Sequence, residues 1–157
     1  MIVGDGPQQP LVKRAVEQAG GWIHWLMSVH KNHEKALLLT ISRVMLNLGM
    51  LGLGILDSFV AKVPIVTSAF GYYSPEIAYL ENGNGIKGLI TPHNVNACID
   101  AVVVGLLEYE VLYINLQAGC ERSAGEVTME EMAGRFCEGI TRCLEQNGVT
   151  PTPAQTA

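Results

Sequence analysis

The feature that most constrains this chain is the largely apolar, glycine-punctuated stretch Val44–Thr67. It opens with the residues VMLNL, which are nearly all apolar and run into a glycine, as is typical of a parallel strand covered on both faces. The glycine-rich segment Gly49–Gly54 follows and predicts a backbone that turns tightly and that a ligand can approach without interference from Cβ atoms. A helix is predicted from Gly52 or Leu53 onwards, and a second buried strand is predicted to open after Pro64. The stretch therefore reads as strand, turn, helix and strand.

The turn in this unit is a candidate binding site for an anion. A connection between a strand and the start of a helix presents backbone amides and the positive end of the helix dipole. In parallel sheets, ligands bind beyond the carboxyl ends of the strands. The alternative is a tight connection that binds nothing, since a glycine pattern of this kind has low specificity alone. The predicted diphosphate-binding residues are Gly49, Met50, Leu51, Gly52 and Leu53.

Several segments together resemble a known family. NLGMLGLGILDSFVAKVPIV, followed by SPEIAYLENGNG, resembles the C-terminal, donor-binding half of a family-four (group 1) glycosyltransferase with the two-Rossmann-domain (GT-B) architecture. IVGDGP at residues 2–7 resembles the exit of that family's second strand, and residues 129–140 resemble its closing helix. These segments stand in the family's order and cover most of the chain. The resemblance implies a Rossmann-like, doubly wound parallel sheet with helices on both faces, lacking its first strand.

The resemblance also implies an activity and a set of site residues. The reaction is transfer of a sugar from a nucleotide-sugar donor to an acceptor hydroxyl, with retained anomeric configuration. In the family an acidic residue on the helix binds the ribose hydroxyls, and Asp57 stands at that position. Gly49 stands where many members carry a glutamate that contacts the sugar. The resemblance therefore implies that backbone amides contact the sugar in this chain. The other implied residues are Leu26, Met27 and Val29 for the nucleobase, with Tyr73 and Glu76 at the rim of the cleft.

The segments that resemble the family do not include its acceptor-binding N-terminal domain or the first strand of its donor domain. We therefore expect the chain to be a fragment of a larger enzyme, inactive alone, and to be able to self-associate through an exposed sheet edge. Two alternatives stay open at this point. One is a catalytically inactive, glycosyltransferase-like partner or regulatory domain, and the other is a fragment of a sugar-nucleotide epimerase. No catalytic residue is identified.

Length and composition exclude several classes of function. The 157 residues predict one domain over residues 1–147 and a disordered tail over residues 148–157. A net charge of −5 without a basic run argues against nucleic-acid binding. The uncharged run between Arg43 and Asp57 has 13 residues, fewer than the roughly 20 that a membrane-spanning helix needs. The four cysteines show neither a metal-binding nor a disulfide pattern. We expect a cytoplasmic protein, with the cytosolic face of a membrane as a second possible location.

The order of secondary structure follows from periodicity, capping signals and turn residues. Strands are predicted at residues 1–3, 22–26, 44–48, 65–67 and 86–90. Helices are predicted at residues 11–19, 32–41, from 52 or 53 to 60, 75–80, from 94 or 96 to 107, 109–124 and from 128 onwards. A metal site is one interpretation of the neighbouring residues His30, His33 and Glu34. The preferred interpretation is the solvent-exposed start of a helix that Asn32 caps. The prediction includes no metal and no cofactor, with the nucleotide-sugar as substrate.

Overall fold

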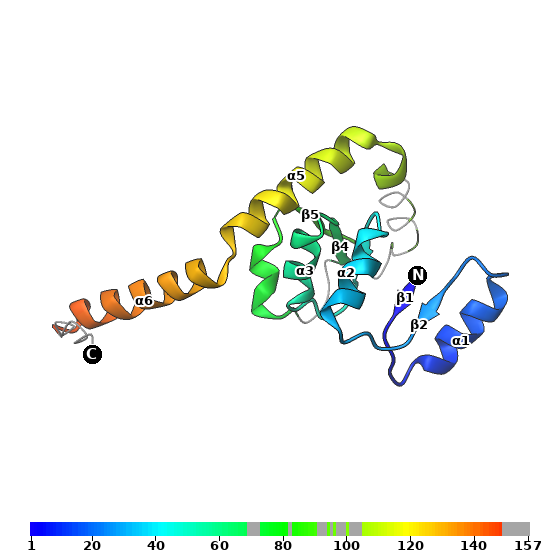
Figure 1. The fold of residues 1–157 in the computed structure, drawn as a ribbon, viewed down its shortest axis with the longest axis horizontal. Helices are drawn as coiled ribbons and strands as arrows, with labels where there is room; N and C mark the ends of the chain where they lie inside the picture. Colours follow the sequence, from blue (N-terminus) through cyan, green and yellow to red (C-terminus); the bar gives the residue numbers. More distant parts are fainter. Residues whose placement is uncertain are drawn as a thin grey trace. The chain divides into compact units, whose positions relative to one another are not determined.

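The structure is a computed structural model that describes residues 1–68, 73–81, 83–90, 94, 96, 100 and 105–148 (Figure 1). It is a mixed α/β structure with parallel strands, as predicted. The contacts divide the chain into two compact units, residues 1–43 and residues 44–157, and each unit is described by itself. The single domain expected over residues 1–147 stays a prediction. Apart from Gly148, the predicted tail lies outside the described residues, as does most of the helix predicted to end at Leu107.

The first unit is built from two strands and two helices. These are β1 (Ile2–Val3), α1 (Gln9–Gln18), β2 (Trp25–Leu26) and α2 (Asn32–Thr40). The two strands pair in parallel, with Ile2 opposite Trp25 and Val3 opposite Leu26. Gly20 follows α1 with a left-handed φ of 61°, a conformation that glycine adopts at little cost and that commonly ends a helix. The predicted end of α1 is therefore confirmed.

The first unit contains no buried residue. On α2 and at its end, Leu37 and Ile41 are 66% and 77% exposed. Trp22, the first residue of the strand predicted at 22–26, is 76% exposed and lies before the short strand β2. Trp25 is held by its indole N–H, which donates to the Gly4 carbonyl at 2.9 Å. The sequence pattern marked these side chains as apolar, but within this unit a two-stranded sheet is too narrow to bury them.

The second unit holds a three-stranded parallel sheet with the strand order β3-β4-β5. Its elements are β3 (Met45–Leu46), α3 (Gly54–Val60), β4 (Ile65–Ser68), the 3-10 helix η1 (Pro75–Tyr79), β5 (Gly85–Ile90), α5 (Glu110–Glu126) and α6 (Met129–Gln146). Met45 lies opposite Ile65, and Ile65 lies opposite Gly85. The predicted strand-turn-helix-strand unit is confirmed, although β3 pairs over only two of its five predicted residues.

The core of the second unit lies on both faces of β4, whose four residues are all buried. Ile65 packs into a cluster with residues of α3 and α5, the largest of which is Phe59. Its neighbour Val66 packs into a second cluster with Leu106 and Leu116. Successive residues of a strand point to opposite faces of the sheet, so the two clusters cover the two faces. This is the environment that the uninterrupted apolar sequence of β4 predicts.

The turn before β5 is locked against α5 by polar contacts at Asn84. The Asn84 amide nitrogen donates to the Tyr79 carbonyl at 2.9 Å and to the Ser123 hydroxyl at 2.8 Å. The Cys120 thiol donates to the Asn84 carbonyl at 3.1 Å, and burial raises the pKa of this thiol to about 11. Buried polar groups need such partners because an unpaired one costs about 1–3 kcal/mol. Asn84 therefore fixes how α5 sits on the sheet.

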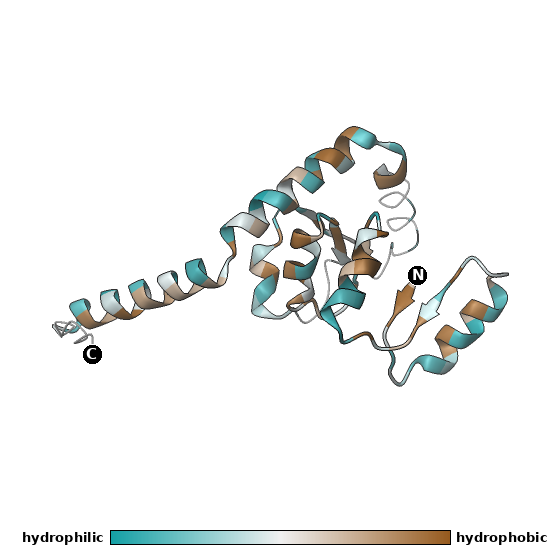
Figure 2. Cartoon of the chain, viewed as in Figure 1, coloured by the Kyte–Doolittle hydropathy of each residue, from teal (hydrophilic) through white to brown (hydrophobic). Residues whose placement is uncertain are grey.

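The last helix, α6, starts at the predicted capping box. The Thr128 hydroxyl accepts a hydrogen bond from the Glu131 amide at 3.2 Å, which satisfies one of the free amides of the first turn. Apolar residues lie along one side of α6 and polar residues along the other (Figure 2), yet none of its residues is buried. Among the helices that the structure describes, none combines the length and the apolar character needed to cross a membrane.

Candidate functional site

The predicted diphosphate turn, residues 49–53, lies between β3 and α3 and is anchored at its start and in its middle. At its start, the Asn47 side-chain oxygen accepts a hydrogen bond from the Gly49 amide at 3.0 Å. In its middle, the Leu51 side chain is fully buried in the core, and the Leu51 carbonyl accepts a hydrogen bond from the Ser74 hydroxyl. Met50 and Leu53 are 72% and 65% exposed on either side of Leu51. The turn is therefore held in place at Gly49 and Leu51, while the side chains of Met50 and Leu53 are exposed to solvent.

The glycines of this turn are not required by its local geometry. None of Gly49, Gly52 and Gly54 adopts a positive φ, so the turn does not use the left-handed conformation that favours glycine. A Cβ atom at these positions would come no closer than 3.9, 3.8 and 3.6 Å to the neighbouring atoms, which is ordinary van der Waals contact. Alanine would therefore fit at all three positions in the described structure. Backbone strain and crowding do not account for glycine here.

The turn carries a run of backbone amides without partners. The amides of residues 50–54 donate no hydrogen bond to any part of the chain that the structure describes. The pattern changes with Ile55, whose amide donates to the Gly52 carbonyl at 3.0 Å, and Leu56 follows by donating to Leu53 at 2.9 Å. Consecutive amide groups of this kind form concave sites that attract anions. With only seven residues, α3 adds little through its dipole, so the amides themselves are the relevant feature.

Asp57 lies in the first turn of α3, three residues after the helix begins at Gly54. Its backbone amide donates to the Leu53 carbonyl at 3.4 Å, which joins the carboxylate-bearing residue to the end of the diphosphate turn. Asp57 is exposed. The position places an acidic side chain near the helix start, where a ligand can reach it from solvent. Its role in binding ribose stays a prediction.

The loop after β4 packs over the same end of the sheet through Ser68 and Tyr73. The Ser68 hydroxyl donates to the Leu48 carbonyl at 3.0 Å, which ties the end of β4 to the end of β3. The Tyr73 hydroxyl donates to the Ser68 carbonyl, and its ring packs against the core cluster. The structure therefore brings the predicted rim residue Tyr73 to the carboxyl ends of the two strands. Residues 69–72 of this loop lie outside the described residues.

Glu76, the second predicted rim residue, opens η1 beside Ser74. The Ser74 hydroxyl, followed by the backbone amide of Glu76, lowers the pKa of the Glu76 carboxyl below its ordinary value of 4.5. A hydroxyl carries one hydrogen, so Leu51 and Glu76 compete for it, and the short contact favours the Leu51 carbonyl. Within the described residues the buried Glu76 Oε2 atom has no hydrogen-bond partner. Ser74 thus links the diphosphate turn to an incompletely satisfied carboxylate.

The predicted nucleobase residues belong to the first unit and are described there alone. Leu26 ends β2 and is half-buried, as is Val29, whereas Met27 is 52% exposed. The first unit has a hollow of about 330 Å³, but it lies at the turn between β1 and α1 and none of these three residues lines it. Their part in binding a base stays a prediction.

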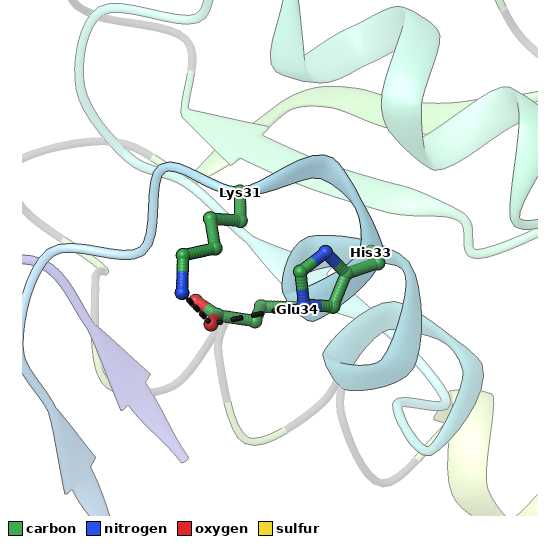
Figure 3. Close-up of polar contacts among 3 residues, drawn as sticks. All are labelled: Lys31, His33 and Glu34. Carbon is green, nitrogen blue, oxygen red and sulfur yellow. Dashed lines mark hydrogen bonds and ion pairs between the residues drawn. The ribbon is translucent and has the colours of Figure 1, made fainter.

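The residues considered for a metal site form an ion pair at the start of α2 (Figure 3). The Lys31 Nζ atom lies 3.1 Å from Glu34 Oε1, and His33 Nε2 lies 3.9 Å from the same oxygen. The helix begins between His30 and His33 as predicted, but its N-cap is Lys31 and not Asn32. Among the described residues, no group of three or more His, Cys, Asp or Glu side chains could hold a metal ion.

Sequence reasoning missed the residues that hold the site in place. Asn47, Ser68 and Ser74 fix the ends of β3, β4 and the turn through side-chain bonds to the backbone. A local signal existed only for Asn47, because an asparagine two residues before a glycine often bonds the backbone in this way. The bonds of Ser68 and Ser74 span 20 and 23 residues, so they depend on the fold.

No family model matches this chain, and no curated protein matches it significantly. The function is therefore argued from the residues themselves.

Proposed function

We propose that this chain binds the diphosphate of a nucleotide-sugar at the turn Gly49–Leu53, as the donor-binding half of a retaining glycosyltransferase. The observation that carries the proposal is the run of backbone amides, residues 50–54, without partners in the described residues. The run follows the carboxyl end of a parallel strand, where ligands of α/β sheets bind. A diphosphate would supply the acceptors that these amides lack. The same proposal assigns binding of the acceptor hydroxyl to a separate acceptor-binding domain.

The glycines support the same conclusion. Neither torsion angle nor packing requires glycine at positions 49 and 52. A ligand that touches the backbone does require it, because a side chain at these positions would keep phosphate oxygens away from the amides. Two exposed apolar side chains, Met50 and Leu53, flank the turn and would shield the diphosphate from water.

The pairing within each unit supports a Rossmann-like fold. In the common doubly wound order, strand 2 pairs with strand 3, and strands 4, 5 and 6 pair in sequence. If β1 corresponds to strand 2, then β1-β2 and β3-β4-β5 reproduce these pairings within their own units. The first strand of such a sheet has no counterpart among the described strands. The two sets of pairings are among those that the glycosyltransferase resemblance implies.

The chemistry of the proposed reaction fits backbone donors. A sugar leaves a nucleotide diphosphate through an oxocarbenium-like centre, and negative charge grows on the departing phosphate oxygens. Fixed amides aimed at these oxygens stabilise the developing charge without having to reorient. The turn is suited to this because Asn47 and the buried Leu51 hold its backbone in place. Asp57 would accept hydrogen bonds from the ribose and orient the nucleotide.

The proposal is tested by nucleotide binding to the wild type and to Asp57→Asn, measured by calorimetry with ADP, GDP and UDP and their 2′-deoxy forms. We expect one base to bind, and the substitution to weaken its binding roughly tenfold, because a charge-assisted hydrogen bond is worth about 1.5–3 kcal/mol. The 2′-deoxy nucleotide should bind the wild type more weakly but lose little more in the variant. Glu138→Gln, which neutralises an exposed carboxylate on α6, should leave all affinities unchanged.

Two outcomes would refute the proposal. One is the absence of binding for every diphosphate tested. The other is an equal loss for the ribose and 2′-deoxyribose forms on Asp57→Asn, which would show that the carboxylate does not contact the ribose.

A further inference from the structure

Asparagine is followed directly by glycine at positions 82, 84 and 147 of the chain. In such a pair the backbone nitrogen of the glycine can attack the side-chain carbonyl carbon of the asparagine, because glycine has no Cβ atom to hinder the approach. The structure describes two of the three pairs in full, one beginning at Asn84 and the other at Asn147. The two are held very differently, and this difference decides which asparagine reacts in the folded protein.

Asn84 is held at both ends of its side-chain amide. Its side-chain oxygen accepts a hydrogen bond from the Glu81 amide at 2.8 Å, and its side-chain nitrogen donates to the Tyr79 carbonyl at 2.9 Å and to the Ser123 hydroxyl at 2.8 Å. Asn84 is 5% exposed, and Gly85 is buried at the start of β5, where it pairs with β4. Bringing the glycine nitrogen onto the side-chain carbon would require these bonds to break and β5 to leave the sheet.

Asn147 stands at the C-terminal end of α6, where much less structure holds it. Its side-chain nitrogen donates to the Cys143 carbonyl at 2.8 Å, and the Gly148 amide donates to the Glu145 carbonyl at 3.1 Å. Both bonds belong to the last turn of the helix, and helix ends open at little cost. Attack of the Gly148 nitrogen on the Asn147 side chain requires the opening of this turn alone.

We propose that Asn147 is a site of spontaneous deamidation in the folded protein, whereas Asn84 is protected. The Gly148 nitrogen loses its proton to hydroxide and bonds to the side-chain carbon of Asn147. The bond from that carbon to Nδ2 breaks, and ammonia leaves with a proton from water, which regenerates hydroxide. Water then opens the cyclic imide at one of its two carbonyls and gives aspartate or isoaspartate. Water is the co-reactant, and the inference does not depend on nucleotide binding.

The product changes the end of α6. A carboxylate has no hydrogen to donate to the Cys143 carbonyl, as the Asn147 amide nitrogen does. It also places negative charge at the C-terminal end of the helix dipole, where negative charge is unfavourable. The last turn of α6 has no basic side chain to offset this charge. We therefore expect the last turn to open more readily after the reaction.

Peptide mapping of the full chain by mass spectrometry tests the proposal after incubation at mildly alkaline pH, which speeds ring closure. Incubation in guanidinium chloride gives the reference rates, because each pair then reacts from the unfolded chain. There we expect Asn84 and Asn147 to deamidate at similar rates. In the folded protein Asn147 should keep its rate to within about tenfold, whereas Asn84 should react at least about a hundredfold more slowly. Fragment ions separate Asn84 from Asn82, which lies on the same tryptic peptide.

Gly148→Ala tests the attacking nitrogen in the unfolded chain. The added Cβ atom should slow deamidation of Asn147 at least about tenfold, which corresponds to about 1.4 kcal/mol of added barrier, and should leave Asn84 unchanged. An unchanged rate at Asn147 in this variant would rule out the ring closure.

Hydrogen exchange compares the deamidated protein with the starting material. Residues 143–148 should exchange faster after the reaction, and equal exchange would contradict the effect on α6. Protection of Asn147 by folding to the degree seen for Asn84 would overturn the proposal. Deamidation of Asn84 in the folded protein as fast as that of Asn147 would overturn it as well.

Discussion

Ser74 connects the predicted diphosphate turn to the rim of the site through one hydroxyl group. The hydroxyl has one hydrogen for two acceptors, the Leu51 carbonyl and the Glu76 carboxyl, and its interaction with the carboxyl is the largest cause of the lowered pKa of Glu76. A lowered carboxyl pKa means that the fold favours the ionised form. The resulting stabilisation is present above the ordinary pKa of 4.5 and is lost as the pH falls through the lowered value.

Ser74→Ala should raise the pKa of Glu76 towards its ordinary value, because the largest cause of the shift is removed. The shift is measured from the side-chain carboxyl carbon of Glu76 in an NMR titration under acidic conditions. Thr141→Ala removes a hydroxyl on α6 that bonds only within its own helix, and it should leave the titration of Glu76 unchanged. An unchanged Glu76 titration in Ser74→Ala would exclude the serine as the cause.

At the scale of elements, the packing of α5 against the turn before β5 depends on two glycines. A Cβ atom at Gly119 would lie 1.7 Å from the Gly83 carbonyl oxygen, and both groups involved are backbone. The helix therefore approaches the turn more closely than any side chain would permit. This contact places Cys120 and Ser123 within reach of Asn84.

Gly119→Ala should lower the free energy of unfolding by about 1–3 kcal/mol or more, because backbone cannot move aside as a flexible side chain can. Gly125→Ala is the matched control on the same helix, where a Cβ atom would meet nothing within 4 Å. It should raise the free energy of unfolding by about 0.5–1 kcal/mol through helix propensity. Urea denaturation measures the free energy of unfolding of both variants. Equal changes in the two variants would contradict the close contact between Gly119 and Gly83.

The elements themselves were largely predictable from local sequence, and the exceptions have tertiary causes. The capping box at Thr128 and the apolar run Ile65–Thr67 define α6 and β4, because both signals lie within a few residues. The helix predicted at residues 109–124 is present as α5 and continues through Gly119, although glycine disfavours a helix interior. Its glycine serves the contact with Gly83, which lies 36 residues earlier in the chain. No local pattern carries that information.

For the whole molecule, buried side chains are confined to the second unit among the described residues. All of them lie between Leu51 and Cys120, whereas residues 1–43 contain none. Burial of apolar surface is the main source of folding free energy, so stability is unevenly distributed along the chain. The first unit has its hydrogen-bonded strands and helices but little burial to hold them.

Native-state hydrogen exchange should separate the two units. The amides of α3 and β4 should exchange only on global unfolding, whereas those of α1 should exchange at least about a hundredfold faster through local opening. Mass spectrometry of proteolytic fragments resolves these segments. Equal protection of α1 and β4 would show that the first unit is stabilised by burial beyond that described.

The candidate site illustrates what sequence can and cannot provide. The position of the turn at residues 49–53 and the place of Asp57 on the following helix were both predictable from glycine spacing and periodicity. The φ angles of these glycines are ordinary, so the turn itself does not require them, and their role in letting a ligand approach the backbone stays a prediction. Ser74, which holds the turn at Leu51, could not be found, since its partner lies 23 residues away in sequence.

The burial of Cys120 has a practical consequence for studies of this protein in solution. Its thiol is inaccessible and has a pKa of about 11, so it forms little thiolate at neutral pH and reacts slowly with maleimide reagents. Cys137 and Cys143, the other cysteines that the structure describes, are both exposed on α6. A fluorophore attached there would report on the last helix without disturbing the interior.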